Sequence, residues 1–265
     1  MPATLELRRA GAVLHVTLNQ PQTRNALSAE MVAELQAVAA ECAVDAHLRC
    51  IVLRGAGGNF CAGGNLTDFQ RLMRMPREGA VDPIAAANRE FGRMLQGWHA
   101  LPQVVVAVVE GAAMGGGFGL AAIGDICLAE ASAQFAMPET SLGLPPAQIA
   151  PFVALRIGQA ATRRLALTAA RIGVREAHAA GLVDEVHEGT DALAEALDKT
   201  LRAVLRCAPG ALRSTKAIVA RAVDLDQTLD FAAGEFARAL RGGEAAEGVR
   251  AFGEKRSPAW VEQPA

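Results

Sequence analysis

Apolar positions near the N-terminus change from a two-residue repeat to a helical repeat. Apolar and polar residues alternate over 5–7 and 13–18, on either side of Ala10 and Gly11, and this pattern predicts a β-hairpin. Ser28 is a residue type favoured at helix N-caps, so a helix is expected to begin after it. That helix would bury one stripe, formed by Met31, Val32, Leu35, Val38, Ala39 and Cys42.

Short apolar runs and helical patterns alternate along the middle of the chain. The run 50–53 ends near Gly55, and the run 104–109 is apolar throughout, which is typical of a strand buried on both faces. Further strands are predicted at 125–129 and 182–186, and helices at 84–101, 160–167 and 174–180. Residues 71–82 are charged and irregular, and we expect a mobile insertion there.

The character of the chain changes after Gly189. Amphipathic helices are predicted at 191–207, 210–223, 227–240 and 244–252, with no strand among them. We therefore divide the chain into a core of strands and helices, residues 1–190, and a helical region, residues 191–265. The alternation of strands and helices in the core predicts an α/β fold. Helices with apolar stripes and little core of their own often pack against a neighbouring subunit.

Composition and charge narrow the classes of function. Of the 265 residues, 51% are apolar and 20% are charged, which is typical of a globular protein. The formal net charge of −2 gives no electrostatic reason to expect nucleic acid or an anionic membrane as a partner. No apolar signal core begins the chain, and no apolar run approaches the roughly 18 residues needed to span a bilayer. We expect a cytoplasmic protein with no membrane partner.

Several catalytic and metal-binding patterns are missing from the sequence. The five cysteines lack Cys-x-x-Cys spacing and the five histidines lack metal-ligand spacing, so neither a disulfide framework nor a metal site is predicted. No lysine follows a glycine as in a phosphate loop, and no serine has a Gly-x-Ser-x-Gly setting. The full Gly-x-Gly-x-x-Gly dinucleotide fingerprint is also missing, and its relaxed form at 117–122 lies well past the preceding strand.

Three segments that follow predicted strands remain as candidates for chemistry: 59–66, 110–119 and 133–144. The first two place glycine where a strand ends, and glycine lets backbone N–H groups approach a ligand closely. The second also opens a helix, whose free N–H groups favour developing negative charge. Two such donors on one oxygen form an oxyanion hole, and removing one donor costs on the order of 3 kcal/mol of transition-state stabilisation.

Taken together and in this order, these motifs resemble those of the enoyl-CoA hydratase/isomerase (crotonase) family. The resemblance covers essentially the whole chain. It rests on residues 19–27, 60–64, 111–117, 135–139, 142–144, 156–158, Ala177, 181–183 and the helical tail.

The resemblance implies a spiral of repeated ββα turns followed by a C-terminal helical region. In the family that region drives homotrimers, which often pair into homohexamers. The expected substrate is an acyl-CoA, so CoA is part of the substrate and no separate cofactor is expected.

Site residues follow from the same resemblance. The N–H groups of Gly64 and Gly116 would bind the thioester carbonyl and stabilise the enolate. Asn65 stands where many members carry Asp, and we expect its side chain to support the loop. The CoA moiety would be lined by Arg24 and Ala26 on its phosphate and pantetheine side, and by Ala62 and Leu66 at the adenine.

The acid/base residues depart from the family pattern. Hydration in this family commonly uses one glutamate to activate water for attack at C3 and a second to protonate C2. Glu139 stands at the position of the second glutamate, whereas Gly119 stands at that of the first. Two enzymatic interpretations follow. In a hydratase, Glu139 would handle the water and the C2 proton in turn, helped by a carboxylate on the substrate. In a double-bond isomerase, Glu139 alone would shuttle one proton between two carbons.

Finer resemblance favours the hydratase. Residues 138–153 are similar to those of branched glutaconyl-CoA hydratases. Gly119 and the pair Pro145–Pro146 are most similar to the 3-isohexenylglutaconyl-CoA hydratases of bacterial acyclic-terpene breakdown. Loss of a glutamate side chain would open space and remove a negative charge, which suits a bulky substrate with its own carboxylate.

Other classes stay open at this point: a thioester hydrolase, a decarboxylase and a non-catalytic acyl-CoA-binding protein. Three further acids lie near the motifs, and for each of them a structural or exposed role is expected. They are Asp68, Glu110 and Asp125.

Overall fold

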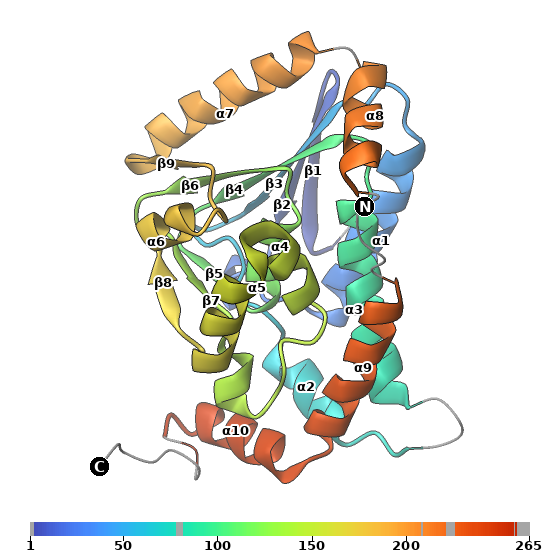
Figure 1. Cartoon of the computed structure of the whole chain (residues 1–265), viewed down its shortest axis with the longest axis vertical. Helices are drawn as coiled ribbons and strands as arrows, with labels where there is room; N and C mark the ends of the chain where they lie inside the picture. Colours follow the sequence, from blue (N-terminus) through green and yellow to red (C-terminus); the bar gives the residue numbers. More distant parts are fainter. Residues whose placement is uncertain (1–2, 78–81, 208, 221–225, 257, 259–265) are drawn as a thin grey trace.

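A six-stranded sheet forms the centre of the molecule (Figure 1). The computed structural model describes residues 3–77, 82–207, 209–220, 226–256 and 258. The strand order is β1-β2-β3-β4-β6-β9, with β1 antiparallel to β2 and all other neighbours parallel. The strands are β1 (Leu5–Ala10), β2 (Val13–Leu18), β3 (Cys50–Gly55), β4 (Val104–Val109), β6 (Ile126–Glu130) and β9 (Glu185–His187). The predicted hairpin and the predicted strands at 50–53, 104–109 and 125–129 are confirmed, whereas the strand predicted at 182–186 forms only at Glu185–His187.

A second, smaller sheet lies beside the first and has the order β5-β7-β8. Its strands are β5 (Ala112–Met114), β7 (Gln134–Ala136) and β8 (Arg171–Gly173). The chain runs repeatedly from the first sheet through this second layer into a helix. It passes from β4 through β5 into α4 (Gly116–Ala122), and from β6 through β7 into the 3-10 helix η2 (Pro138–Leu142).

Earlier turns of the spiral use single bridges in the second layer. After β3, Cys61 bridges to Ala113 before α2 (Leu66–Met73) begins. After β2, a 3-10 helix (η1, Pro21–Thr23) leads to Leu27, which bridges to Gly64 before α1 (Ala29–Val44). The repeat of strand, second layer and helix confirms the predicted α/β spiral of ββα turns.

The remaining helices largely follow the predicted ranges. They are α3 (Pro83–His99), α5 (Ala150–Thr168), α6 (Val174–Ala179), α7 (Gly189–Arg206), α8 (Pro209–Ala220), α9 (Asp226–Leu240) and α10 (Gly243–Gly253). Ser28 caps α1 as predicted, since its Oγ accepts from the Met31 N–H at 3.1 Å. α5 begins ten residues before the predicted 160, and a kink at Gly158 (φ 78°) divides it, so the predicted range covers only the part after the kink. In the described part of the chain, no helix is long and apolar enough to cross a membrane.

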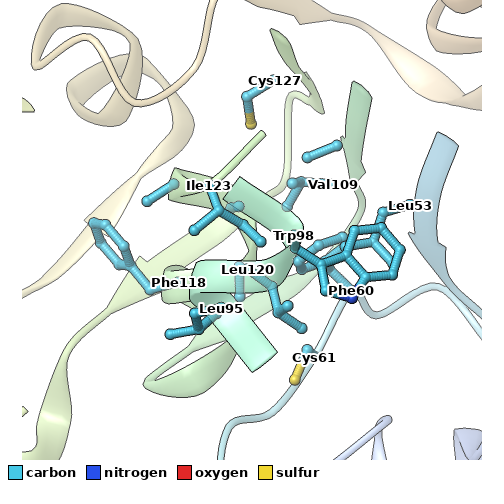
Figure 2. Close-up of a cluster of buried hydrophobic side chains, with 14 of the residues drawn as sticks. Leu53, Phe60, Cys61, Leu95, Trp98, Val109, Phe118, Leu120, Ile123 and Cys127 are labelled. Carbon is cyan, nitrogen blue, oxygen red and sulfur yellow. The ribbon is translucent and has the colours of Figure 1, made fainter. Parts of the chain in front are cut away.

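The main core fills the space between the sheet and helices α1, α3, α4 and α5. Figure 2 shows Leu53, Phe60 and Trp98 lying together there, with Leu120 beside them and the Phe118 ring pointing away from them, and all five are fully buried. The polar Trp98 Nε1–H donates to a backbone carbonyl of α1 at 2.9 Å, so the ring is buried without an unpaired donor. Every residue of α4 is buried in this core, which explains why α4 is rich in glycine and alanine.

The opposite face of the sheet has its own apolar core beneath α7. Residues of β4 alternate between the two cores, since Val106 belongs to the outer one and Val105 to the inner one. α7 contributes Leu193 and Leu197 to the outer core, and Figure 1 shows it running across the sheet. β4 is therefore buried on both faces, as its continuous apolar run predicts. The domain boundary at residue 190 stays a prediction.

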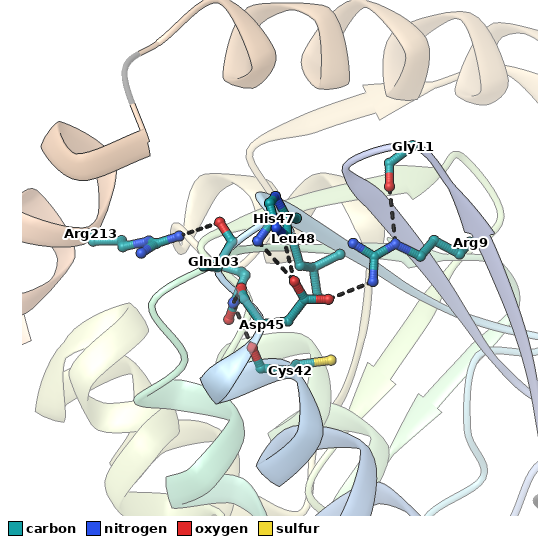
Figure 3. A network of polar contacts seen from close by, with 9 residues as sticks. Arg9, Gly11, Cys42, Asp45, His47, Leu48, Gln103 and Arg213 are labelled. Carbon is teal, nitrogen blue, oxygen red and sulfur yellow. Dashed lines mark hydrogen bonds and ion pairs between the residues drawn. The ribbon is translucent and has the colours of Figure 1, made fainter.

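A polar network joins the end of α1 to three other parts of the chain (Figure 3). The Asp45 carboxylate accepts from Arg9 of β1 and from the backbone N–H groups at 47 and 48. Gln103 Nε2 donates to the Cys42 carbonyl at 2.6 Å, and Arg213 of α8 donates to the Ala46 carbonyl at 2.8 Å. The Cys42 carbonyl lies in the last turn of α1 and the Ala46 carbonyl lies just beyond the helix, so these bonds tie the end of α1 to β1, to the segment before β4 and to α8.

Helices α9 and α10 pack over α2, α3 and η2. Phe236 of α9 lies against Phe69 of α2, with ring centroids 6.1 Å apart. Arg241 donates to both oxygens of Asp82, at 2.6 Å each, and Asp82 also caps α3 by accepting from the Ile84 N–H. The predicted mobile insertion at 71–82 is therefore wrong at both ends: 71–73 belong to α2, and Asp82 is the N-cap of α3. Residues 78–81 lie outside the described residues.

Replacing Asp82 by asparagine is expected to lower the free energy of unfolding by about 1–2 kcal/mol, because Arg241 loses a charged, two-pronged partner. Asparagine still caps α3, so the substitution isolates the ion pair. The Arg241 hydrogen bond lowers the pKa of Asp82 to about 2. The stabilisation is therefore complete above the ordinary carboxyl pKa and is lost as pH falls toward 2. Urea unfolding at pH 7 and at pH 3 measures both effects.

The matched control is Asp198→Asn, because Asp198 pairs with Arg202 on the exposed face of α7. An exposed pair of this kind contributes about 0.5 kcal/mol or less. Equal losses in the two variants would contradict the assignment.

Candidate active site

The two glycine-rich segments meet at their backbones. A Cβ at Gly63, which has a φ of 95°, would lie 2.8 Å from the Met114 carbonyl oxygen. A Cβ at Gly115, which has a φ of 50°, would lie 3.8 Å from the Gly63 Cα. The segments are held together by the Cys61 N–H, which donates to the Ala112 carbonyl at 2.8 Å, and by the Met114 N–H, which donates to the Cys61 carbonyl at 2.9 Å. This contact requires residues without side chains.

Gly64 and Gly116 each lie one residue beyond that contact. In the bridge between Leu27 and Gly64, the Leu27 N–H donates to the Gly63 carbonyl and the Asn65 N–H donates to the Leu27 carbonyl. The Gly64 N–H is not used by this bridge. Gly116 is the first residue of α4, so its N–H has no partner within the helix. Among the described residues, neither N–H has a hydrogen-bond acceptor. Both donors are available to a bound oxygen.

The Glu139 carboxyl lies at the same junction. Its Oε1 is 2.7 Å from the point that a Cβ at Gly115 would occupy. Its Oε2 is buried and has no hydrogen-bond partner within the part of the chain that the structure describes. Burial raises the pKa of Glu139 to about 7. The surrounding turn is fixed by the Leu144 N–H, which donates to the Glu139 carbonyl at 3.0 Å. A carboxyl able to hold or release a proton near neutral pH therefore stands beside the two glycine segments.

The space beside Gly119 is filled. Gly119 lies within α4, and its N–H donates to the carbonyl of the N-cap Gly115 at 3.1 Å. A Cβ at Gly119 would lie 2.6 Å from Ile149 Cγ2 and 3.6 Å from Leu95 Cδ1. Ile149 is 3% exposed and Leu95 is fully buried. The expectation that loss of the glutamate opens space is therefore wrong, because apolar side chains from α3 and from the start of α5 occupy the position.

Three other acids near the motifs already have partners, as expected for structural roles. Asp68 accepts from the Ala29 N–H at 2.9 Å, Glu110 pairs with Arg54 at 2.8 Å, and Asp125 pairs with Lys216 at 2.6 Å. Burial also raises the pKa of the nearby Cys61 thiol to about 12, so it is not a thiolate at neutral pH. Because the other three acids are held by these contacts, Glu139 is the candidate for proton transfer.

The predicted CoA-binding residues lie together at one rim of this junction. The Ala62 N–H donates to the Arg24 carbonyl at 2.9 Å, so residues 24–27 and 62–65 run side by side. Arg24 is exposed, and Ala26, Ala62 and Leu66 are half-buried. Their contacts with CoA stay a prediction.

Asn65 supports the loop, as expected. Its Oδ1 accepts from the N–H groups of Thr67, at 2.9 Å, and Asp68, at 3.3 Å. It thereby caps α2 directly after Gly64. Because an aspartate oxygen could accept the same two bonds, the family's alternative residue fits the same role.

Asn25 lies within the motif 19–27, but the motif did not predict its role. The side chain is fully buried and bridges two loops. Its Oδ1 accepts from the Gln20 N–H at 2.9 Å, and its Nδ2 donates to the carbonyls of Ala56 and Asn59 at 2.9 and 2.8 Å. Its backbone has a φ of 57°, a conformation that asparagine tolerates better than most residues. Asn25 therefore holds the loop that carries Arg24.

Apolar residues around the glycines were missed by sequence reasoning. A Cβ at Gly116 would lie 2.6 Å from Leu27 Cδ1 and 3.2 Å from Phe91 Cζ, and one at Gly64 would lie 2.5 Å from Phe69 Cζ. These side chains come from separate elements of the chain. The helical spacing of Phe91 and Leu95 in α3 marks a buried face, but it carries no information about what that face contacts.

The fold and this junction define a crotonase-type α/β protein with one buried carboxyl and two backbone N–H groups that have no acceptor among the described residues. That both N–H groups bind one oxygen stays a prediction. The family model for enoyl-CoA hydratase/isomerase matches residues 8–263. The chain belongs to the enoyl-CoA hydratase/isomerase family.

Known proteins similar to this chain include two solved structures. One is Pseudomonas aeruginosa AtuE, 49% identical, with a TM-score of 0.79 and coverage of 98% of this chain and 100% of AtuE. The other is an enoyl-CoA hydratase/isomerase from Marinobacter aquaeolei, 47% identical, with a TM-score of 0.80 and coverage of 98% and 99%. The (E)-benzylidenesuccinyl-CoA hydratase of Thauera aromatica is 30% identical over 98% of this chain and 99% of its own length.

Glu139→Gln is expected to stabilise the folded protein at alkaline pH. The folded-state pKa of Glu139 is raised, so burial of this carboxyl costs little below its ordinary pKa. The cost grows as pH rises through about 7, because the folded protein must then bury an anion. We expect the variant to be more stable than wild type by roughly 1–3 kcal/mol at pH 8.5 and by much less at pH 5. Urea unfolding at the two pH values tests this.

Glu110→Gln is a suitable control, because Glu110 is paired with Arg54 and the substitution removes a charge that has a partner. A stability gain independent of pH in Glu139→Gln would show that Glu139 is not the titrating group.

Proposed function

We propose that this protein is an acyl-CoA hydratase that adds water across the α,β-double bond of a branched enoyl-CoA of the 3-isohexenylglutaconyl-CoA type. The observation that carries the proposal is the position of the Glu139 carboxyl. It lies beside the two glycine segments, whose Gly64 and Gly116 N–H groups have no acceptor among the described residues. CoA enters as part of the substrate, and no separate cofactor takes part.

Each group has a defined task in the proposed reaction. The Gly64 and Gly116 N–H groups bind the thioester carbonyl oxygen and stabilise the negative charge that develops there when water adds. Ionised Glu139 removes a proton from water as its oxygen attacks C3, which gives the enolate. The protonated Glu139 then returns a proton to C2, and the thioester carbonyl re-forms. One carboxyl suffices because a pKa of about 7 lets it accept and donate near neutral pH.

The rim formed by Arg24, Ala26, Ala62 and Leu66 is proposed to hold the CoA moiety. Arg24 is exposed and cationic, which suits a CoA phosphate, and the other three offer small or apolar surface. Because residues 62–65 also carry Gly64, binding of CoA there brings the thioester to the proposed donors.

Two observations support a branched substrate with its own carboxylate. First, apolar Ile149 and Leu95 stand where a second carboxylate would be, so that part of the site carries no negative charge to repel an anionic substrate. Second, a relative over the full length of the chain is named for hydration of benzylidenesuccinyl-CoA. We also propose a homotrimer or homohexamer as the assembled form, which light scattering on the purified protein would identify.

The proposal is tested by hydration of 3-methylglutaconyl-CoA and of unbranched crotonyl-CoA, each followed by loss of the enoyl-thioester absorbance. We expect the branched substrate to have the higher kcat/KM. Glu139→Gln should lower kcat by about 10²–10⁴-fold, because general acid–base catalysis is lost. Glu110→Gln is the control and should keep wild-type rates, because Glu110 is paired with Arg54.

Product mass distinguishes the other activities. Gain of one water supports hydration, an unchanged mass with a moved double bond indicates an isomerase, and loss of CoA or CO₂ indicates a hydrolase or a decarboxylase. Tight binding of acyl-CoA without turnover would identify a binding protein. Much faster hydration of crotonyl-CoA than of the branched thioester would contradict the proposed substrate.

A further inference from the structure

One side chain of the core lies where the proposed reaction would otherwise place a second carboxyl. Ile149 Cγ2 and Cβ lie 2.6 and 3.1 Å from the point that a Cβ at Gly119 would take. Gly115, which faces the Glu139 carboxyl, is the N-cap of α4 and stands four residues before Gly119. The Gly119 N–H donates to the Gly115 carbonyl at 3.1 Å, so the two glycines that face Ile149 and Glu139 are joined by one hydrogen bond at the start of α4.

The placement of Ile149 is fixed by its neighbours in the chain. The adjacent Gln148 is 2% exposed, and its Nε2 donates to Asn88 Oδ1 at 2.9 Å. A Cβ at Gly92 would overlap the Gln148 side-chain amide, so the amide occupies a notch on α3 that only glycine leaves free. Asn88, Gly92 and Leu95 recur at helical spacing, so one face of α3 receives Gln148 and also packs beside Gly119.

Ile149 has little freedom to leave this position. It is β-branched, and such side chains have few allowed χ1 rotamers. Its own carbonyl accepts from the Val153 N–H at 3.0 Å in the first turn of α5, and the Ala150 N–H donates to the Pro146 carbonyl at 2.9 Å. The residue is therefore a rigid apolar wall and not a movable gate.

We propose that Ile149 is the residue that determines acyl-chain specificity in this enzyme, and that Gln148 is the residue that positions it. The inference rests on the proposed function. An apolar wall at Gly119, four residues after the glycine that faces the proton-transfer carboxyl, presents a surface to the carbon chain attached near C3, where a second carboxyl would present a charge and hold a water. Substrates with an apolar branch at C3 gain contact with Ile149, whereas an unbranched chain does not reach it.

Kinetics with a pair of acyl groups test the specificity. The probes are crotonyl-CoA and 3-isohexenylglutaconyl-CoA, and the measured quantity is the ratio of their kcat/KM values. Ile149→Phe should lower the ratio, branched over unbranched, by at least about tenfold, because a few extra methylenes in an apolar pocket change discrimination by 10–200-fold. Ile149→Leu keeps the volume but moves the methyl away from Gly119, and should change the ratio in the same direction by less.

The matched control is Ile172→Ala, compared with Ile149→Ala. Both isoleucines are 3% exposed in the same core, but Ile172 lies on β8 and pairs with Phe135. Loss of bulk in the core should lower the Tm of both variants, whereas only Ile149→Ala should change the ratio. If the branched-to-unbranched kcat/KM ratio is the same in Ile149→Ala, Ile149→Leu and wild type, the proposal is overturned. If wild type hydrates neither probe, the proposed function itself fails.

Packing can be tested without any substrate. Gly119→Ala should lower the Tm of wild type by several degrees, because its methyl group meets Ile149. In the Ile149→Ala background the same substitution should cost clearly less, since Cγ2 is gone. Equal shifts in both backgrounds would show that Ile149 does not fill the position.

Gln148→Met tests the positioning role, because methionine has similar length but cannot donate to Asn88. We expect a change of a few-fold in the branched-to-unbranched ratio, with Asn88→Leu producing a change in the same direction. If both variants have a lower Tm but an unchanged branched-to-unbranched kcat/KM ratio, Gln148 does not position Ile149. The specificity role of Ile149 is decided by the variants of Ile149 itself.

Discussion

The close approach of two backbones at Gly63 and Gly115 is the constraint on which the rest of the site depends. Each glycine has a positive φ, and a side chain on either would collide with the opposite segment or with Glu139. The contact joins the second and third ββα turns of the spiral and places Gly64 and Gly116 one residue beyond it. Both N–H groups belong to the main chain, Gly64 at the bridge to Leu27 and Gly116 at the start of α4, so their orientation is fixed by the fold.

The second feature of the site is a single buried carboxyl together with apolar side chains around Gly119. Glu139 stands in a desolvated position, and the space beside Gly119 of α4 is filled by Ile149 and Leu95. A second carboxylate there would raise the cost of ionising Glu139 further, since two like charges close together cannot both ionise easily. With one acid, burial alone raises the pKa to about 7.

The C-terminal helices contribute to the same arrangement from outside the spiral. Phe236 packs on Phe69, and Phe69 lies against Gly64. Arg241 binds Asp82, the N-cap of α3. Two side chains of α3 lie beside the glycines of α4: Phe91 beside Gly116 and Leu95 beside Gly119. The helical region therefore supports the site through two contacts, even though it adds no strand to either sheet among the described residues.

Local patterns in the sequence determined much of this protein. The alternation before β2, the cap at Ser28 and the continuous apolar run of β4 each predicted the element that forms, because period and capping depend on residues close in the chain. The glycine motifs and Glu139 were also recognisable, since their order along the chain identifies the family. The short strands β5, β7 and β8 were not predicted, because three residues carry no measurable period.

Tertiary structure alone decided what surrounds the glycines. Gly119 in the sequence indicated a missing glutamate and suggested open space, but Ile149, thirty residues later, fills it. The side chains at Gly64 and Gly116 likewise come from α2, α3 and the bridge at Leu27. A glycine in the sequence shows only that its position has no side chain. Which neighbour takes the space depends on how distant segments pack, and no local pattern contains that information.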